Sequence, residues 1–498
     1  MEPNESIKMT FPNKLSYSFM VQLFVREIAK MIGFSSNQLD QIDIAIEESV
    51  SNIMVHTSDE ENPTFDVICE KIPGGIKIVL KEMGIPFDSA RVKNFELTKA
   101  LDEQTTTGLG IYLIRKVMDE LSFNNLGPQG KETVMIKYLP DYQEHKNQQE
   151  ITSEKQSPDN VIAEKIDYDV RGLDEEEAIE VSRCAYKTHG YTFFDDHIYY
   201  PERLVNMNRT SEMISAVAVT KDKVFMGHAA LLYQYPEDTI AELTFVFVNV
   251  EYRGQGALNR LVDYLFKVPK KRELRGIYAY AVTNHIFTQK SMIKFQINDC
   301  GILLATSPAS WKFKGISDNA SQRISVVLDY RYMTPPAQYN LFAPEHHKMM
   351  ISKLYQNLGS SPNFLVPSAD TFKYDIATTV FYTGVNELES CAEIFIASYG
   401  SDVKLQLRKI LRGFCIKQVA AINLFLKLED PLTYWLTEEF EKLGFFFAGI
   451  LPESRIGDAL VLQYLNNVDM DYSKILLVSD VAKELLAYIR ERDPNIFE

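Results

Sequence analysis

The chain has 498 residues, which is too long for one hydrophobic core and predicts two to four domains. A hydrophobic content of 46% is ordinary for a soluble globular protein, and a formal charge of −16 argues against general nucleic-acid binding, because phosphate contacts require concentrated Lys and Arg. No apolar run approaches the roughly 18 residues that a membrane-spanning helix needs, so we expect no membrane partner.

The opening residues MEPNE lack the basic stretch and the apolar segment of a signal peptide. The five cysteines are scattered and form neither a CxxC pair nor a regular disulfide pattern. Both features fit a reducing compartment, so we expect a cytoplasmic protein.

The first strong element is a helix predicted over residues 38–56, where apolar residues recur at helical spacing. Glu48 and Asn52 are four residues apart and therefore share one face of this helix. An Asn side-chain oxygen can coordinate Mg²⁺, and a Glu one turn away can orient or deprotonate an attacking hydroxyl. Taken alone, this pair is more typical of a solvated helix face.

Two glycine-containing segments follow that helix. Residues 75–81 predict a strand that runs into EMGIPFD, where a carboxylate at Glu82 and a bare backbone at Gly84 suit hydrogen bonding to an adenine amino group. The segment TTTGLG, residues 105–110, opens a helix that we expect to continue through Leu121, and its start offers free N–H groups to phosphates. Each segment also has a plain structural interpretation, as a β-turn and as an ordinary N-cap.

In this order and spacing, the three segments resemble the GHKL ATPase fold, in the branch of anti-sigma factors with serine kinase activity. EESVSNIMVH is similar to the Asn box, KEMGIPFD to the first glycine box and TGLGIYLIRKVMDEL to the second, over about residues 8–139. The resemblance implies an α/β sandwich that binds ATP and Mg²⁺, with Asn52 as the metal ligand, Glu48 as the kinase base and residues 91–107 as the lid. It places the nucleotide against Asn52, Glu82, Gly84, Thr107, Gly108 and Gly110.

That resemblance also implies a regulatory protein partner, sigma-like or anti-anti-sigma-like, at residues 1–140. The family usually has Asp where this chain has Glu82, and the extra methylene displaces the carboxylate that would meet adenine. Residues 141–160 are polar and contain almost nothing to bury, so they predict a linker.

Beyond the linker, residues 241–250 alternate as a strand and run into EYRGQGA and a helix with Leu258, Leu261 and Leu265 on one face. A strand, a glycine-rich turn and a helix can bind a pyrophosphate through backbone N–H groups. A helix at 175–187 and a hairpin-like pair of strands at 213–220 and 224–233 precede this segment, and a strand at 276–282 and a helix at 285–295 follow it.

That order resembles a GNAT N-acetyltransferase over about residues 166–329, a mixed sheet with flanking helices. The resemblance implies that acetyl-CoA binds at Val248, Val250, Arg253, Gly254, Gln255, Gly256, Ala257 and Leu258, that an amine substrate enters beside splayed strands, and that Glu242 is the general base. A plain exposed strand residue is the alternative for Glu242. The family's second small residue in the loop is replaced by Leu258, and its customary tyrosine acid by Met292.

The paired prolines in MTPPAQYNLF suggest a second boundary, which gives domains over 1–140, 161–332 and 333–498. The last region has a strand-like run at 415–428 and a segment EKLGF that looks like a degenerate second GNAT half without a cofactor loop, since RKILRG is not one. It would complete a tandem fold, line the substrate site or form a homodimer. His346 and His347 have no spaced Cys or carboxylate partner in the sequence, so we expect no metal there.

Three functions remain open on the sequence. The first is an acetyl-CoA-dependent N-acetyltransferase whose activity is regulated by ATP or by a partner bound at residues 1–140. The second is a partner-switching serine kinase in which the GNAT region only senses acetyl-CoA. The third is a scaffold with two decayed sites.

Overall fold

The structure is a computed structural model that describes residues 6–55, 63–84, 109–139, 166–189, 193, 195–252, 254–268, 272–309, 311, 321–334, 336–368 and 372–496. The chain forms two compact units. The first comprises Met1–Ile166, Ala178–Lys187 and Asp196–Glu202, and the second comprises Asp167–Glu177, Thr188–Asp195 and Arg203–Glu498. The expected linker at 141–160, the expected lid at 91–107 and the residues Thr107, Gly108 and Arg253 lie outside the described residues.

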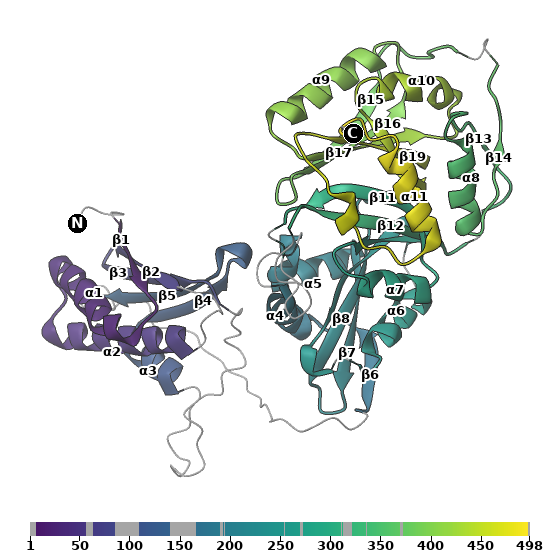
Figure 1. Cartoon of the computed structure of the whole chain (residues 1–498). Helices are drawn as coiled ribbons and strands as arrows, with labels where there is room; N and C mark the ends of the chain where they lie inside the picture. Colours follow the sequence, from purple (N-terminus) through teal and green to yellow (C-terminus); the bar gives the residue numbers. More distant parts are fainter. Residues whose placement is uncertain are drawn as a thin grey trace. The chain divides into compact units, whose positions relative to one another are not determined.

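The first unit contains a five-stranded sheet in the order β1-β2-β3-β5-β4, antiparallel throughout. Its elements are β1 (Ser6–Pro12), α1 (Ser18–Ile32), α2 (Ser36–Val55), β2 (Thr64–Ile72), β3 (Gly75–Glu82), α3 (Leu109–Val117), β4 (Glu120–Asn125) and β5 (Lys131–Tyr138). The three helices lie against one face of the sheet (Figure 1). The apolar residues of that face and of the helices form one core, so the predicted α/β sandwich is confirmed.

The helix expected through Leu121 is shorter than the sequence suggests, because α3 ends at Val117 and Leu121 lies in β4. Leu121 pairs with Met135 of β5 across the sheet. An apolar residue such as Leu121 fits both a helical pattern and a strand. Pairing with β5 places Leu121 in a strand here.

The second unit is built on a 12-stranded mixed sheet in the order β15-β16-β17-β19-β18-β11-β12-β10-β9-β8-β7-β6 (Figure 1). Its strands are β6 (Tyr168–Gly172), β7 (Met213–Thr220), β8 (Phe225–Leu232), β9 (Ile240–Val248), β10 (Gly276–Val282), β11 (Asn298–Ser307), β12 (Ile324–Tyr332), β15 (Val380–Asn386), β16 (Cys391–Ser398), β17 (Ala421–Lys427), β18 (Phe446–Ser454) and β19 (Gly457–Leu465). The strands β13 (Asn340–Leu341) and β14 (Asn363–Phe364) form a separate parallel pair.

The helices that follow the first unit's sheet are α4 (Ala178–His189), α5 (Pro201–Thr210), α6 (Ala257–Lys267), α7 (Phe287–Lys294), α8 (Lys348–Asn357), α9 (Val403–Ile416), α10 (Pro431–Glu441) and α11 (Asp480–Arg490). Among the described residues, no helix combines the length and the apolar character that crossing a bilayer requires. The predicted mixed sheet with flanking helices is confirmed.

Within the 12-stranded sheet, one topology occurs twice. In what we call the first half (residues 166–334), β9 runs parallel to β10, and β10 and β11 both lie antiparallel to β12. In the second half (residues 336–496), β16 runs parallel to β17, and β17 and β18 both lie antiparallel to β19. One apolar core contains residues of β10, β11 and β12 of the first half together with residues of the second half, so the two halves are packed on each other.

The halves meet where Gly301 of β11 pairs with Gly449 of β18. These glycines occupy equivalent places, because each follows a bulge of one residue, Cys300 in β11 and Ala448 in β18. A Cβ atom added to Gly449 would lie 2.3 Å from the Cα of Gly301, and Gly449 also has a φ of +150°. Only glycine permits this close backbone approach, so the seam between the halves depends on it.

Two expectations for the second half need correction in detail. The strand expected at 415–428 begins only at Ala421, because Cys415 and Ile416 complete α9. The segment RKILRG lies inside α9. The loop equivalent to the first half's glycine-rich turn is residues 399–402, between β16 and α9.

Candidate functional site

In the first unit, three of the expected nucleotide residues lie together. Glu48 and Asn52 are on α2, and Gly110 is in the first turn of α3. A Cβ atom at Gly110 would lie 2.6 Å from Oε2 of Glu48 and 3.6 Å from Nδ2 of Asn52. A glycine is therefore needed for the start of α3 to approach the carboxylate and the amide, an arrangement that fits a magnesium nucleotide.

Glu82 ends β3 and points to the same face of the sheet as the helices, since it alternates with the core residues Ile78 and Leu80. Only 9% of Glu82 is exposed, and its carboxylate forms an ion pair of 3.3 Å with Lys131 on β5. Burial raises the pKa of Glu82, and Lys131 opposes this shift. An adenine amino group at Glu82 would share the carboxylate with Lys131. Gly84 lies two residues beyond.

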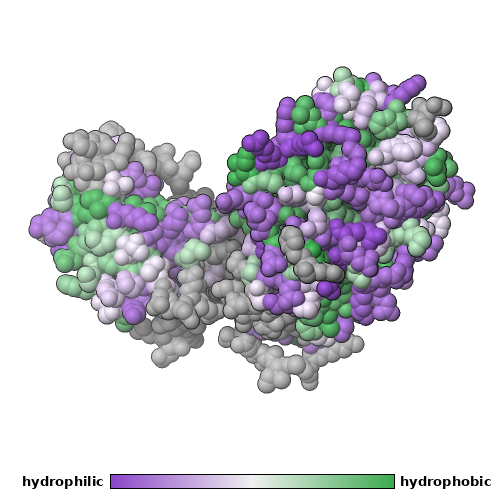
Figure 2. All heavy atoms as spheres, turned by 45° about the horizontal axis from the view of Figure 1, so that its top comes forward, coloured by the Kyte–Doolittle hydropathy of each residue, from purple (hydrophilic) through white to green (hydrophobic). Residues whose placement is uncertain are grey.

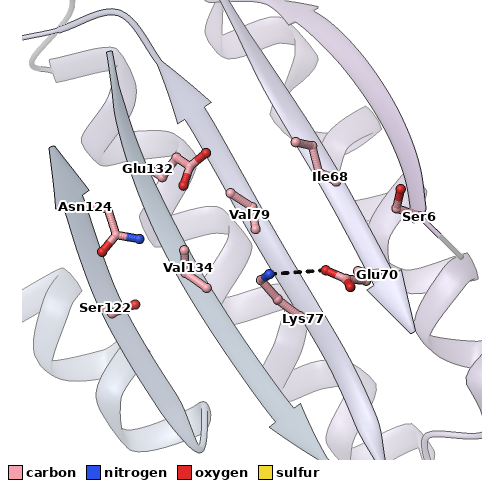
Figure 3. Close-up of a pocket in the computed structure, with 9 residues that line it drawn as sticks. All are labelled: Ser6, Ile68, Glu70, Lys77, Val79, Ser122, Asn124, Glu132 and Val134. Atoms are coloured by element: carbon pink, nitrogen blue, oxygen red, sulfur yellow. Dashed lines mark hydrogen bonds and ion pairs between the residues drawn. The ribbon is translucent and has the colours of Figure 1, made fainter. Parts of the chain in front are cut away.

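The opposite face of this sheet carries a shallow hollow with a volume of about 430 Å³ (Figure 3). Its floor carries an ion pair of 3.2 Å between Lys77 and Glu70. The lining residues are Ser6, Ile68, Glu70, Lys77, Val79, Ser122, Asn124, Glu132 and Val134. None of the expected nucleotide residues is among them, so the hollow is separate from the candidate ATP site.

In the second unit, β9 and β10 separate beside Glu242. They pair over only three residues, and the last pair joins Glu242 to Tyr278, although β9 continues to Val248. A bulge in β9 begins two residues later, where Phe245 takes a φ of +51°. The bulge bends β9 away from β10, which opens a gap between two parallel strands.

His228 of β8 holds this bulge in place. It is fully buried, and its Nδ1 lies 2.7 Å from the carbonyl oxygen of Phe245. Burial lowers the pKa of His228 to about 4, against the effect of this hydrogen bond. A neutral imidazole therefore donates from Nδ1 to the strained residue of the bulge.

The glycine-rich loop follows β9 directly. Val248 pairs with Gly227, Val250 lies in a short 3-10 turn, and α6 begins with Ala257 and Leu258. Gly254 and Gly256 have φ values of +83° and +78°, and a Cβ atom at Gly254 would meet nothing within 4 Å. The loop therefore has the open backbone that a pyrophosphate requires.

Tyr168 and Arg260 hold the loop in place. The Tyr168 hydroxyl donates to the carbonyl oxygen of Gln255 over 3.1 Å, and Arg260 donates to the carbonyl oxygen of Tyr168 over 2.9 Å. The guanidinium of Arg260 also lies 4.3 Å from the centre of the Tyr168 ring. The loop is thus preorganised by side chains that the sequence alone did not single out.

Glu242 is buried, with 7% of its surface exposed. Burial raises the pKa of Glu242 to about 8; a hydrogen bond from Thr244 opposes the shift, and the charges of Asp195, Glu389 and Glu393 add to it. Such a pKa is close to neutral pH, as suits a group that accepts and releases a proton. Glu242 is therefore a buried titrating group and not an exposed strand residue.

Met292, at the place of the expected tyrosine acid, lies in α7 and is buried. The side chain that does stand beside Glu242 is Tyr278, whose hydroxyl has no hydrogen-bond partner among the described residues. The alternating segment GIYAYAV could have indicated it, because alternate residues of a strand share a face.

The second half has Glu393 where the first has Glu242. Successive cross-strand partners in the first half are Glu242, Tyr278, Tyr330 and Asn298. The equivalent partners in the second half are Glu393, Asn423, Gln463 and Phe446. Here, however, β16 and β17 stay paired over six residues. No gap opens beside Glu393.

The loop of the second half is also closed. It spans only residues 399–402, and residues 376–379 lie across it. The N–H of Gly400 donates to Oγ1 of Thr379 over 2.9 Å, and the N–H of Ser401 donates to the carbonyl oxygen of Ile376 over 3.2 Å. A Cβ atom at Gly400 would lie 2.5 Å from the backbone of Thr379. The chain itself therefore takes the N–H groups that a ligand would need.

His346 and His347 do have a carboxylate partner, which the sequence reasoning missed because Glu441 is far away along the chain. Glu441 contacts Nε2 of His346 at 2.9 Å and Nε2 of His347 at 2.6 Å. Burial opposes the shift, but these hydrogen bonds lower the pKa of Glu441 to about 2. Nδ1 of His347 lies 2.8 Å from the Tyr488 hydroxyl. These contacts link the residues just before α8 to α10 and α11.

Comparisons with known proteins agree with this geometry. Residues 11–137 match the family model of the histidine kinase-like ATPase domain, and residues 179–290 match that of the GNAT acetyltransferase family. The serine-protein kinase RsbW of Bacillus thuringiensis (strain Al Hakam) is 27% identical over 143 residues, which are 28% of this chain and 88% of the relative. The chain therefore joins a histidine kinase-like ATPase domain to a GNAT acetyltransferase domain.

Solved acetyltransferases align with about a third of the chain. The spermidine N-acetyltransferase SpeG of Vibrio cholerae, in a point-mutant form, is 15% identical with a TM-score of 0.26, over 33% of this chain and 94% of its own. An N-acetyltransferase from Staphylococcus aureus Mu50 is 16% identical with a TM-score of 0.27, over 34% and 99%.

Proposed function

We propose that the chain is an acetyl-CoA-dependent N-acetyltransferase that also binds ATP and Mg²⁺ in its first unit. The observation that supports this best is the combination, on one strand, of the gap beside Glu242, the bulge at Phe245 and the open loop at Gly254 and Gly256. Together these support a buried proton acceptor next to a site for a thioester and its pyrophosphate.

In the reaction, the nitrogen of a neutral primary amine attacks the thioester carbonyl carbon, the C–N bond forms and the C–S bond breaks. Coenzyme A leaves as its thiol or thiolate. Glu242 accepts the proton that the amine nitrogen loses, directly or through a water, which its pKa of about 8 permits. We propose that the hydroxyl of Tyr278, a residue in register with Glu242, donates to the leaving sulfur.

The backbone N–H groups of the loop and of the first turn of α6 would hold the pyrophosphate of acetyl-CoA. The residues involved are Val248, Val250, Arg253, Gly254, Gln255, Gly256, Ala257 and Leu258. Helix α6 adds the positive end of its dipole at this place. Leu258 does not disturb the arrangement, because the two glycines that need left-handed backbone come before it.

In the first unit, Asn52 would hold Mg²⁺, Glu48 would orient a hydroxyl, and Glu82, Gly84, Thr107, Gly108 and Gly110 would surround the nucleotide. Bound ATP would supply a phosphoryl group. We propose domains over 1–140, 161–332 and 333–498, joined by a linker at 141–160, with the second and third sharing one sheet.

Calorimetric titration of one sample with ATP–Mg²⁺ and then with acetyl-CoA tests both sites. Both ligands are expected to bind, and acetyl transfer to a panel of primary amines is expected in the presence of acetyl-CoA. If acetyl-CoA does not bind, the acetyltransferase is refuted. If neither ligand binds, the chain is a scaffold with two decayed sites.

A second candidate function is a serine kinase of a protein partner, with the GNAT region as a sensor of acetyl-CoA. The observation that favours it is an exposed apolar face on α1. Phe19 is 72% exposed and Leu23 is 49% exposed one turn later, and Leu15 and Met20 extend the face. Figure 2 shows hydrophobic side chains on the surface of this part of the molecule. Contiguous exposed apolar residues mark protein-binding surfaces, here for a sigma-like or anti-anti-sigma-like partner.

Substituting Asn52→Ala tests that candidate. Loss of ATP binding and of ATP-dependent serine phosphorylation in a partner would support it, and acetyl transfer should then be unchanged. If Asn52→Ala leaves ATP binding intact, the candidate ATP site is wrongly placed.

A further inference from the structure

His346 and His347 direct both of their imidazole rings at one carboxylate. The two histidines lie in the turn before α8, and Glu441 is the last residue of α10. Nε2 of His346 lies 2.9 Å from one oxygen of Glu441, and Nε2 of His347 lies 2.6 Å from the other. The expectation that no metal binds here rested on a missing carboxylate partner, and Glu441 supplies that partner.

The three ligand atoms are close enough for one metal ion. They all lie within 4.8 Å of one another. Zn²⁺ binds imidazole nitrogen and carboxylate oxygen at about 2.0–2.2 Å, so two ligand atoms of a tetrahedral ion are roughly 3.4 Å apart. His346 and Glu441 can make the small adjustment this requires, because their side chains are 35% and 24% exposed. The same exposure gives an ion access from solvent.

The surroundings of His347 fix the orientation of its ring. The side chain is fully buried, and its ring centre lies 4.7 Å from that of Phe447 on β18. Its other nitrogen, Nδ1, lies 2.8 Å from the hydroxyl of Tyr488 on α11. Arg492 holds Tyr488 in turn, since its guanidinium lies 3.4 Å from the centre of the tyrosine ring and donates to the carbonyl oxygen of Tyr488. Histidines that bind metals commonly use their second nitrogen for such a hydrogen bond.

The hydrogen bonds around His347 point to a cation at its Nε2. The hydroxyl of Tyr488 donates its one proton to the carbonyl oxygen of His346 over 3.0 Å, so it accepts from Nδ1 of His347. A neutral imidazole has a single N–H group, which is then on Nδ1. Nε2 holds only a lone pair, yet it faces a carboxylate oxygen of Glu441 at 2.6 Å. Two acceptors at this distance repel each other unless a second proton or a metal ion supplies positive charge.

A metal ion supplies that charge better than a second proton does. A proton on Nε2 would make His347 an imidazolium with no exposed surface, and burial of a charged group is costly even when the group is paired. A metal ion also carries charge, but it bonds directly to both rings and to Glu441, which offsets its loss of hydration. The exposed Glu438 adds negative charge nearby, with its carboxylate 4.0 Å from Nδ1 of His346.

We propose that His346, His347 and Glu441 bind a divalent transition-metal ion, Zn²⁺ above all, and that Tyr488 positions His347 for it. Two imidazole nitrogens and one carboxylate suit Zn²⁺, and three protein ligands leave the fourth position to a water molecule. The ion connects the turn before α8 to the end of α10 and, through Tyr488, to α11. Its role is to stabilise the second half, and it does not depend on the proposed acetyl transfer.

Calorimetric titration of the full chain with ZnCl₂, after treatment with EDTA and dialysis, tests the site. His197→Ala serves as the parent protein, because His197 with Asp195 and Asp196 is the other group of potential ligands among the described residues. The parent is expected to bind one equivalent of Zn²⁺, and its Tm should rise when Zn²⁺ is added. Adding His346→Ala or Glu441→Gln to the parent should weaken binding more than about 100-fold and abolish the rise in Tm, since a ligand is lost.

Two further variants of the same parent sharpen the test. Glu438→Gln removes a charge from the same helix, three residues before Glu441, and should leave the Kd for Zn²⁺ within about twofold, because an exposed charge near a site contributes little. Tyr488→Phe should raise the Kd roughly 10- to 100-fold, as expected for the loss of a group that orients a ligand. It should also shift the visible absorption of bound Co²⁺, which a purely structural role of Tyr488 would leave unchanged.

Two outcomes overturn the proposal. If His346→Ala and Glu441→Gln bind Zn²⁺ as tightly as the parent does, the ion is bound elsewhere. If the parent binds neither Zn²⁺ nor Co²⁺, the three side chains form a metal-free network, in which the Tyr488 hydroxyl donates to Nδ1 of His347 and Nε2–H donates to Glu441. Circular dichroism of each metal-free variant shows whether it is folded. The exposed position of His346 makes His346→Ala the variant that the fold tolerates best.

Discussion

The strands β9 and β10 pair over three residues and then separate, whereas their counterparts β16 and β17 stay paired over six. The loop after β9 has two glycines in left-handed conformation and open space, whereas the loop after β16 is crossed by residues 376–379. The two halves nevertheless share strand order, pairing direction and the position of a bulge. The difference teaches that a shared strand order does not fix the gap between the strands or the form of the loop, on which the proposed acyl-CoA site depends.

What the second half retains is also informative. It has a glutamate, Glu393, at the place of Glu242, and the charges of Glu389 and Glu393 add to the raised pKa of Glu242. The following four predictions test this comparison.

The largest effect is expected for Glu242→Gln. Loss of a general base should lower kcat about 100- to 10,000-fold while acetyl-CoA affinity is unchanged. Because Glu242 must be deprotonated to accept a proton, the wild-type kcat should rise with pH to a plateau above an apparent pKa near 8, and the variant should lack this inflection. Initial rates from about pH 6 to 9.5 measure both, with Glu387→Gln as the control. A variant with the wild-type pH profile would show that another group takes the proton.

Gly256→Val should weaken acetyl-CoA binding at least about 10-fold. A β-branched residue at a φ of +78° costs about 1–2 kcal/mol, and its side chain also enters the pyrophosphate loop. Calorimetry with acetyl-CoA measures the change. The matched control in the second half is Gly413→Ala on α9, which has open space and should bind acetyl-CoA as the wild type does. Equal affinity in the two variants would mean that acetyl-CoA binds elsewhere.

Gly449→Ala should destabilise the second unit by about 2–4 kcal/mol, because the new Cβ atom meets the backbone of Gly301 at a strained φ of +150°. Denaturant unfolding followed by the fluorescence of Trp311 and Trp435 measures it. Gly413→Ala, inside a helix, should instead stabilise the chain by about 0.5–1 kcal/mol. If Gly449→Ala unfolds at the wild-type midpoint, the close glycine seam is not formed.

The smallest effect concerns stability against pH. Folding raises the pKa of Glu389 and Glu393 from an ordinary 4.5 to about 7, so their stabilising contribution is complete below pH 4.5 and is lost as pH rises towards 7. Glu242 extends this window to about pH 8. The Tm should therefore fall between about pH 5 and 8, and Glu389→Gln/Glu393→Gln should flatten that fall. Scanning calorimetry across this pH range measures it; a slope equal to that of Glu387→Gln would exclude the raised pKa values.

The sequence by itself determined the two kinds of domain and the place of the residues that local patterns mark. Glu48 and Asn52 share a helix face because of their spacing. The glycines of RGQG allow a turn with left-handed backbone, whatever the rest of the fold. The strands 213–220 and 276–282 were predicted with the bounds that the structure has, because their periodicity and flanking turns agree.

Only the tertiary structure decided the features that depend on distant parts of the chain. Sheet pairing ended α3 before Leu121, and a backbone segment closed the second loop. Lys131 became the partner of Glu82, and Glu441 joined His346 and His347 from nearly a hundred residues away. The equivalence of Glu242 and Glu393 has the same origin: it rests on strand register, which is set by pairing between strands and leaves no local signal in the sequence.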